Sequence, residues 1–196
     1  MPRKGRSFVT LLFFVVSAGH ADDHPVFYVD KGACPFECCT YRDWGTEKTT
    51  KLYAEPNTSS PIVGVAEKGA TVKAQTGEVH TKPGKFIASR DYIRHTDRAT
   101  LFKKGDILWV YTELGEGYYK IWYRGGFFEF PIPVIENEWN ADYYKRHPDE
   151  LWGYFEVKPV SVWWVKVRTR AGLEGWLNQP EHFSNQDACG QTRATY

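Results

Sequence analysis

The sequence predicts a mostly β protein, and three observations support this. Short runs of β-branched and aromatic residues, such as 62–65 and 161–168, alternate with stretches of Gly, Pro, Asn and Asp that form turns. The first runs lie about ten residues apart, the spacing of strands in a small barrel or sandwich. Side chains along 119–124 alternate in character, as they do on the two faces of a sheet.

The first 21 residues have the features of a signal peptide. Three basic residues among the first six precede an apolar run over 8–18, which is shorter than the roughly 20 residues that span a bilayer. Gly19 and Ala21 supply the small side chains that signal peptidase accepts before a cut after Ala21. No cysteine stands directly after that point to carry a lipid anchor, and no later stretch is apolar enough to cross a membrane. We therefore expect a periplasmic or secreted protein whose mature chain starts near Asp22 and has no transmembrane segment.

The charge balance excludes one class of partner. Lys and Arg together number 25 and Asp and Glu 24, so no long-range field favours nucleic acid or an anionic membrane. Aromatic residues make up 16% of the chain, with eight Trp, and their ordinary use in a small exported protein is to build a compact core.

The four cysteines predict two disulfides. They are Cys34, Cys38, Cys39 and Cys189. Their even number, in a chain expected to reach an oxidising compartment, favours disulfides over free thiols. A bond between the adjacent Cys38 and Cys39 would strain the peptide, so Cys34 pairs with one of them and Cys189 with the other. Either pairing links the two ends, and closing so long a loop stabilises a fold by about 4 to 5 kcal/mol in the chain-entropy model.

A zinc site is the weaker alternative for the same cysteines. Four thiolates, or three with His80 or His182, would suit the metal, but the spacing matches no known zinc finger or ribbon. We predict no metal and no cofactor.

The first half of the chain contains a polar segment and then short strands. Residues 22–50 are irregular apart from the cysteines and a run over 27–29 that predicts an edge strand. From Lys51 the predicted strands are 52–54, 62–65 and 70–74, separated by turns over 56–61 and 67–69. A second β-rich block then predicts a three-stranded meander over 107–112, 118–123 and 127–130.

The last part returns to strands after a less regular stretch over 131–159. Residues 140–146 are the best candidate there for a short helix. A strand over 161–168, a turn over 169–172 and a return strand over 174–177 then predict a hairpin. Trp163 and Trp164 are adjacent in this strand and face opposite sides, so at most one belongs to the core. The other must be exposed, covered by the preceding stretch, or used for a ligand.

The two ends of this pattern resemble the bacterial SH3 (SH3b) family of small β-barrels. The first half of the family pattern matches Leu52, Pro56, Val63-Gly64, Lys68-Gly69 and Val72, and the second half matches Trp164-Val165-Lys166-Val167, Gly172 and Gly175-Trp176-Leu177. About 85 residues separate these halves where the family usually has only a few. The chain is also similar to exported bacterial proteins that contain SH3-like domains, which implies a fold more firmly than an activity.

The resemblance implies SH3-like barrels in an unusual arrangement. The inserted block has its own barrel-like residues, Lys104-Gly105-Asp106, Tyr119 to Trp122, and Gly126. Either two SH3-like units are nested, which we favour narrowly, or one barrel carries a large β-rich insertion. The expected segments are a signal peptide (1–21), a cysteine-containing segment (22–50), barrel halves (51–78 and 160–180), the inserted unit (79–159) and a C-terminal tail (181–196).

The same resemblance implies a ligand groove lined by aromatic residues. In SH3-type barrels Tyr and Trp form a shallow groove for extended peptides, because flat rings give large contact area at low entropy cost. By this analogy Tyr53 and Trp163 line such a groove. Tyr111, Tyr118 and Tyr119 contribute from the inserted unit.

Catalytic motifs are sparse. A cysteine enzyme needs a thiolate with a His in reach, usually at the start of a helix, but no helical pattern follows these cysteines and the histidines are scattered through turn-like sequence. The acidic pairs Glu136/Glu138 and Asp149/Glu150 are candidates for acid–base chemistry on a glycan, but no cleft-forming pattern accompanies them. We predict that the chain is not an enzyme, with a small cell-wall hydrolase as the least favoured alternative.

The expected function is therefore binding. We expect an exported, non-catalytic SH3-like module that binds an extended peptide or a cell-envelope component, with a peptidoglycan peptide or an envelope protein as partner and no nucleic acid. The alternative is a structural scaffold that docks on another protein and has no small ligand. An exposed apolar patch above a few hundred Å² would favour the scaffold.

Overall fold

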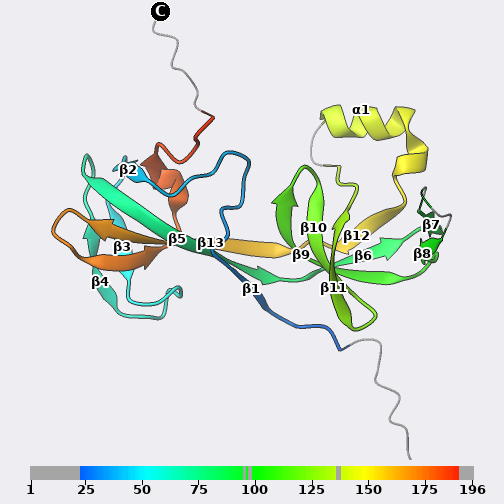
Figure 1. The fold of residues 1–196 in the computed structure, drawn as a ribbon, viewed down its shortest axis with the longest axis horizontal. Helices are drawn as coiled ribbons and strands as arrows, with labels where there is room; N and C mark the ends of the chain where they lie inside the picture. The colour runs from blue at the N-terminus through cyan, green and yellow to red at the C-terminus, as the bar shows by residue number, and fades with distance from the viewer. Residues whose placement is uncertain (1–22, 95, 97–98, 136–137, 190–196) are drawn as a thin grey trace, which may run out of the picture.

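The computed structural model describes residues 23–94, 96, 99–135 and 138–189, and this part of the chain is mostly β (Figure 1). The first sheet contains, in order, β15 (Phe183–Ser184), β2 (Asp43–Thr46), β5 (Thr71–Lys82), β13 (Val160–Thr169), β14 (Glu174–Leu177), β3 (Thr50–Tyr53) and β4 (Ile62–Ala66), with β1 (Tyr28–Lys31) also paired to β5. The second sheet contains β11 (Gly126–Pro131), β10 (Tyr118–Tyr123), β9 (Ile107–Gly115), β6 (Gly84–Ala88) and β12 (Gly153–Val157).

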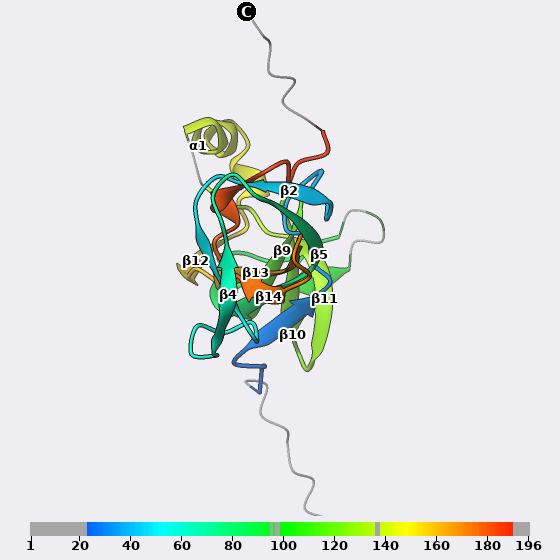
Figure 2. The same cartoon turned by 90° about the vertical axis from the view of Figure 1, so that its left-hand side faces the viewer.

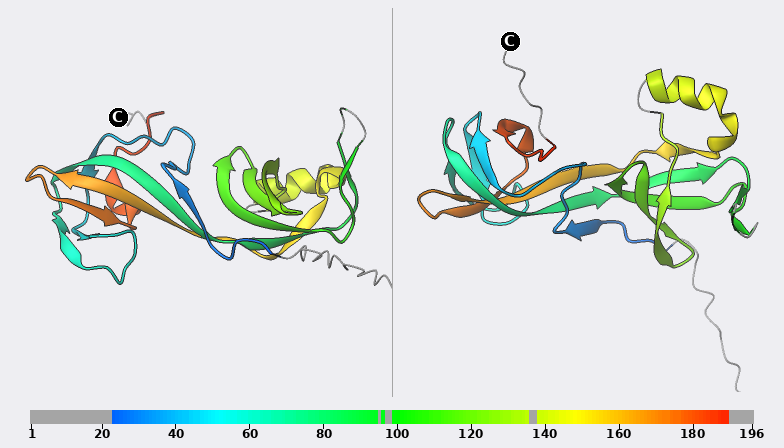
Figure 3. Two further views of the ribbon diagram at one scale, coloured as in Figure 1. Left: turned by 60° about the horizontal axis from the view of Figure 1, so that its bottom comes forward. Right: turned by 45° about the horizontal axis from the view of Figure 1, so that its top comes forward.

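The second sheet is inserted into the first. β5 leads into β6 through the single residue Pro83, and β12 leads back into β13 through Lys158 and Pro159. β5 and β13 pair antiparallel along the whole length of β13. Figure 3 shows the two sheets at opposite ends of an elongated molecule, joined by these long strands. The structure thus confirms a mostly β fold in which one β unit interrupts another.

The smaller elements belong to the inserted unit and the C-terminal region. β7 (Tyr92–Ile93) and β8 (Thr100–Phe102) form a two-stranded ribbon. The helix α1 (Glu138–Arg146) and the 3-10 turn η1 (Pro148–Glu150) connect β11 to β12, and a second 3-10 turn, η2 (Pro180–His182), precedes β15. α1 has Glu138 in its first turn and two basic residues in its last, which suits the helix dipole.

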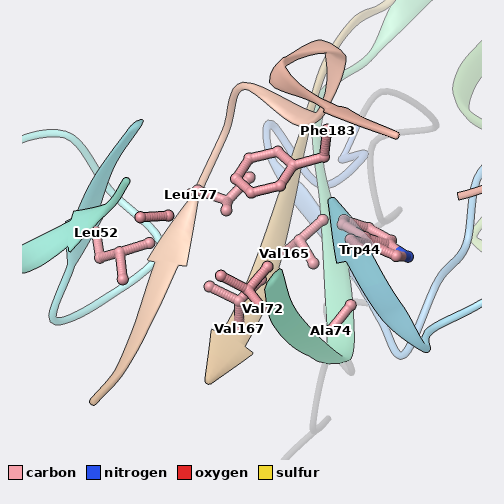
Figure 4. Close-up of a cluster of buried hydrophobic side chains, with 9 residues drawn as sticks. Trp44, Leu52, Val72, Ala74, Val165, Val167, Leu177 and Phe183 are labelled. Atoms are coloured by element: carbon pink, nitrogen blue, oxygen red, sulfur yellow. The ribbon is translucent and has the colours of Figure 1, made fainter. Parts of the chain in front are cut away.

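The first sheet is curled (Figure 2) and encloses a largely aliphatic core (Figure 4). Alternate residues of β5 and β13 point inward, because successive side chains of a strand face opposite sides. Trp44 from β2 and Phe183 from β15 pack on the same core, with ring centroids 6.1 Å apart. The buried set is Trp44, Leu52, Ala66, Val72, Ala74, Val165, Val167, Leu177 and Phe183.

The second sheet has an aromatic core. Trp152 stacks on Phe102 with the ring centroids 5.3 Å apart, and Phe86 meets Trp152 edge-on at 4.8 Å. Offset and edge-to-face contacts of this kind stabilise a core beyond the area that they bury. The buried set is Phe86, Ala88, Phe102, Leu108, Val110, Tyr119, Ile121, Ile132 and Trp152.

A glycine allows the two connecting segments to pass close together. A Cβ atom on Gly84 would lie 2.4 Å from the backbone nitrogen of Pro159 and 2.7 Å from the carbonyl oxygen of Val157. Because both neighbours are backbone atoms, neither can move aside cheaply. The junction between the sheets therefore requires a residue without a side chain at position 84.

Two disulfides link the N-terminal segment to itself and to the C-terminal region. Cys34 bonds to Cys39, and Cys38 bonds to Cys189, with Cα–Cα distances of 5.5 and 5.4 Å. This is one of the two pairings that the sequence allows, and it confirms the predicted link between the two ends. Within the described residues, no helix has the length and apolar character needed to span a membrane.

Most predicted elements are confirmed, and several strands are new. The meander and the final hairpin lie where predicted, and the helix begins two residues earlier. β5, predicted over 70–74, continues to Lys82, and β2, β6, β7, β8, β12 and β15 were not expected. The predicted signal peptide, Glu136 and residues 190–196 lie outside the described residues.

Candidate binding groove

Two hollows, of about 270 and 510 Å³, lie where the two sheets meet. We name them the inner hollow and the outer hollow, respectively. Pro35, Thr112 and Glu113 line both, so the two hollows adjoin, and we name them together the junction groove. One wall is the segment that follows β1, and the other is the end of β9.

The inner hollow is lined by both apolar and polar side chains, and buried hydroxyl groups lie beside it. Its lining is Pro35, Val79, Tyr111, Thr112, Glu113, Tyr119, Val134, Phe155, Lys158, Pro159 and Ser161. The buried Thr81 hydroxyl lies 2.9 Å from the Ser161 hydroxyl and 3.3 Å from the Thr112 hydroxyl. These hydroxyls hydrogen-bond one another, as most buried polar groups in proteins do.

The outer hollow is more open and carries exposed apolar side chains. Its lining is Asp30, Ala33, Cys34, Pro35, Phe36, Glu37, Thr112, Glu113, Leu114, Gly115, Glu116, Tyr118 and Glu129. Phe36, Leu114 and Tyr118 are all exposed. Five carboxylates line this hollow, and no Lys or Arg does.

β9 presents an unpaired edge to the groove. Its pairing with β6 ends at Val110, and no other described strand pairs with β9 on that side beyond this point. Residues Thr112 to Gly115 line the outer hollow, and among the described strands β10 is the only one that pairs with β9 in this stretch. The register with β10 shifts twice in this stretch, so β9 carries extra residues and bends there.

The opposite wall is a loop closed by the Cys34–Cys39 disulfide. Its residues Cys34 to Glu37 line the outer hollow. The Tyr41 hydroxyl donates a hydrogen bond to the Ala33 carbonyl, and the Trp163 indole N–H donates to the Tyr41 oxygen at 3.2 Å. The Phe36 ring meets Trp163 edge-on, with the centroids 5.9 Å apart. The first sheet thus holds this loop in place.

Gly77 of β5 provides the space beneath that loop. A Cβ atom there would lie 2.5 Å from the Trp163 indole nitrogen and 2.9 Å from the Ala33 carbonyl oxygen. The backbone N–H of Gly32 also donates to the Gly77 carbonyl at 2.7 Å. The loop therefore packs directly against the backbone of β5.

Ionisable groups around the groove are shifted by burial and hydrogen bonding. Burial raises the pKa of Tyr111 to about 12, and its hydroxyl donates to the Pro25 carbonyl at 2.6 Å. The hydrogen bond from Lys120 to the Tyr28 hydroxyl, 3.1 Å long, raises the pKa of Lys120, and the charges of Asp30 and Glu129 raise it further. Lys120 therefore stays charged beside two of the groove carboxylates.

The structure brings together three of the five predicted aromatic residues. Tyr111 and Tyr119 line the inner hollow and are 0% and 7% exposed, whereas Tyr118 lines the outer hollow and is 46% exposed. Trp163 is half-buried behind Phe36 and does not line either hollow. Only Tyr118 of these four presents a largely exposed ring to a ligand.

Tyr53 lies elsewhere, on the first sheet. Its ring meets the buried Trp164 edge-on at 5.8 Å. Trp164 lines a separate hollow of about 440 Å³ with Phe27 and His80. Of the two adjacent tryptophans, Trp164 is thus buried, and Trp163 is covered by the N-terminal segment and not by the inserted unit.

Sequence reasoning missed Phe36, Leu114 and the carboxylates of the outer hollow. One signal was available, because a disulfide between Cys34 and Cys39 forces the residues between them into a tight loop at the surface. The convergence of distant acidic residues depends on the sheet topology and has no local signal.

Residues that the sequence offered for a metal site or for acid–base catalysis are engaged in other interactions. Cys38, Asp187 and Cys189 lie close enough to hold a metal ion, but both sulfurs are in the Cys38–Cys189 disulfide and offer no thiolate. Asp149 pairs with Arg90 at 3.1 Å, and Glu150 accepts a hydrogen bond from Tyr143 at 2.8 Å.

Comparison with known proteins gave no match to any family model, curated protein or solved structure. The resemblance to the bacterial SH3 family therefore stays a prediction, and the groove itself is the basis for a functional proposal.

Proposed function

We propose that the chain is an exported, non-catalytic module that binds an extended peptide segment of a cell-envelope component in the junction groove. The observation that carries this proposal is the unpaired edge of β9, which runs between the two hollows over Thr112 to Gly115. An open strand edge of this kind offers backbone groups to an added strand.

The two hollows suit the side chains of a peptide laid along that edge. Tyr119 lines the inner hollow and Tyr118 the outer one, and adjacent residues of β10 face opposite sides of the sheet. An extended peptide beside β9 therefore sends alternate side chains into the two hollows. Backbone hydrogen bonds supply affinity in such complexes, and the pockets supply specificity.

Exposed aromatic rings support the binding of a peptide at the outer hollow. Tyr118 and Phe36 stand on opposite walls, one on β10 and the other in the disulfide-closed loop. Flat rings lose little conformational entropy when a ligand covers them. The two disulfides also support export, because such bonds persist in oxidising compartments.

A specific observation favours the scaffold as a second candidate. Exposed apolar side chains follow β12 and the start of β13, namely Tyr154, Val157, Val160 and Val162. Apolar residues gathered in this way are typical of surfaces that dock on other proteins. In that case the partner covers β12 and β13, and the junction groove stays empty.

The test uses two defined probes, a displayed library of random 12-residue peptides and purified peptidoglycan. We expect the mature chain to select peptides from the library. These peptides should bind the double variant Phe36→Ser/Tyr118→Ser at least about ten-fold more weakly than they bind the unmodified chain, because both exposed rings are lost. The matched control is Tyr154→Ser, which removes an equally exposed aromatic ring outside the groove. Near-ultraviolet circular dichroism checks that each variant is folded.

The outcomes separate the candidates. Binding that depends on Phe36 and Tyr118 but not on Tyr154 supports the groove. Binding that depends on Tyr154 alone supports the scaffold. If the library yields no peptide and peptidoglycan retains no protein, the proposal of a peptide-binding groove is wrong.

A further inference from the structure

We infer that the ligand of the junction groove is a basic peptide, an extended segment with Lys or Arg at alternate positions and apolar residues between them. This inference rests on the proposed function, and it adds the charge and the sequence pattern of the ligand.

The acidic character of the outer hollow is local. The whole chain is nearly neutral, with 25 basic and 24 acidic residues, yet five carboxylates and no cationic side chain line this hollow. They come from separate segments: Asp30 from β1, Glu37 from the disulfide-closed loop, Glu113 from β9, Glu116 from the β9–β10 turn and Glu129 from β11. The fold brings together charges that are dispersed in the sequence.

Most of these carboxylates have no direct cationic partner. Asp30, Glu37, Glu116 and Glu129 take part in none of the ion pairs found among the described residues. Two cations lie nearby: Lys120, whose ammonium group donates to the Tyr28 hydroxyl at 3.1 Å, and Lys158, which lines the adjoining inner hollow. Two Lys beside these four carboxylates still leave an excess of negative charge, which an incoming cation would neutralise.

The spacing of the carboxylates suits several cationic side chains better than one metal ion. No three carboxylates of the outer hollow have oxygen atoms within 4.8 Å of one another, since the one such cluster among the described residues is that of Cys38, Asp187 and Cys189. A divalent cation needs several oxygen ligands around one point. Carboxylates distributed around a groove match charges distributed along a peptide.

The apolar residues of the groove explain why basic and apolar residues should alternate in the peptide. Lys and Arg pack their aliphatic stems on apolar surface while their charged ends stay in water, and Phe36, Leu114 and Tyr118 provide that surface beside the carboxylates. The intervening side chains of the peptide face the inner hollow, whose walls include Val79, Tyr119 and Phe155. The expected pattern is therefore basic and apolar residues in alternation.

Three eight-residue peptides test the inference: one alternates Lys with Val, and the other two carry Gln or Glu in place of Lys. Binding is measured by fluorescence anisotropy at low and high salt. We expect the Lys peptide to bind about ten-fold more tightly than the Gln peptide at low salt, the Glu peptide to bind most weakly, and the preference to shrink at high salt because exposed charges are screened.

Two variants with the same change in net charge test whether the preference for Lys over Gln arises in the outer hollow. Glu37→Gln/Glu116→Gln removes two carboxylates from the outer hollow, whereas Glu47→Gln/Glu55→Gln makes the same change in net charge at exposed residues that line neither hollow. We expect the first variant to lose most of the preference for Lys over Gln and the second to keep it.

The failures of the two proposals are distinguishable. Equal binding of the Lys and Gln peptides, both sensitive to Phe36→Ser/Tyr118→Ser, would overturn the charge inference and leave the groove in place. A Lys preference that both charge variants reduce equally would reflect net charge alone and would also overturn it. A Lys peptide that does not bind is evidence against the inference, and the peptide library then decides whether the groove binds peptides at all.

Discussion

The two β units differ in how their cores are assembled along the chain. The core of the second unit draws on residues between Phe86 and Trp152, a continuous stretch, and is dominated by aromatic rings. The core of the first unit draws on segments before and after that stretch, from Trp44 to Ala74 and from Val165 to Phe183, and is mostly aliphatic. The core of the first unit therefore depends on contacts between segments that the inserted unit separates in the sequence.

This difference explains where the covalent links lie. Bringing together segments separated by a long loop costs entropy, and the Cys38–Cys189 disulfide spans 151 positions and connects the two outer segments of the first unit. Both disulfides lie beside the first sheet, and the second core contains none. The stability of the first unit should depend on disulfides, and that of the second should depend on packing.

Removal of the long-range disulfide is the strongest test of this comparison. We expect Cys38→Ser/Cys189→Ser to destabilise the first unit by up to about 5 kcal/mol, because the unfolded chain regains the entropy of a long loop. Hydrogen exchange followed by mass spectrometry should show faster exchange in β2, β5 and β15 and little change in β9 and β10.

The short-range disulfide supplies the matched control. Cys34→Ser/Cys39→Ser opens a link between positions only five apart, for which the same model gives about 2 kcal/mol. Equal acceleration of exchange in both sheets, for either variant, would mean that the two units unfold together and that the comparison is wrong.

A smaller effect tests the junction between the units. We expect Gly84→Ala to cost about 2 to 3 kcal/mol, because its Cβ would lie 2.4 Å from the Pro159 backbone nitrogen. Gly126→Ala is the control, since a Cβ there meets only the Phe128 ring at 3.5 Å, which is ordinary contact. Urea unfolding measures both. Similar midpoints for the two variants would show that the junction tolerates a shift and that the groove walls are not fixed by it.

The sequence predicted those strands that are rich in apolar or aromatic residues and are bounded by Gly turns. The hairpin of β13 and β14 has an apolar strand and a Gly turn, and the meander of β9 to β11 has Gly turns between aromatic runs. The second half of β5 was missed because Val79 is its one buried large apolar residue among polar neighbours. β2 was missed because its four residues include one large apolar side chain, Trp44.

The candidate site was harder to predict than the fold. Tyr111, Tyr118 and Tyr119 were named from an analogy, and the structure places them at the junction groove, but two of them are buried. Tyr111 lies in the stretch of β9 where the register with β10 shifts, and such shifts have no sequence signal. The pairing of the outer cysteines was likewise left open between two choices that only the three-dimensional path distinguishes.

The most direct test of the central claim is to map a bound peptide by nuclear magnetic resonance. The ¹⁵N-labelled mature chain is titrated with the alternating Lys–Val peptide, and changes in the amide resonances are followed. We predict the largest changes on the two walls of the junction groove, at Thr112 to Gly115 and at Cys34 to Glu37. Changes centred on the hollow of Phe27 and Trp164, or on β12 and the start of β13, would contradict the assignment of the groove as the binding site.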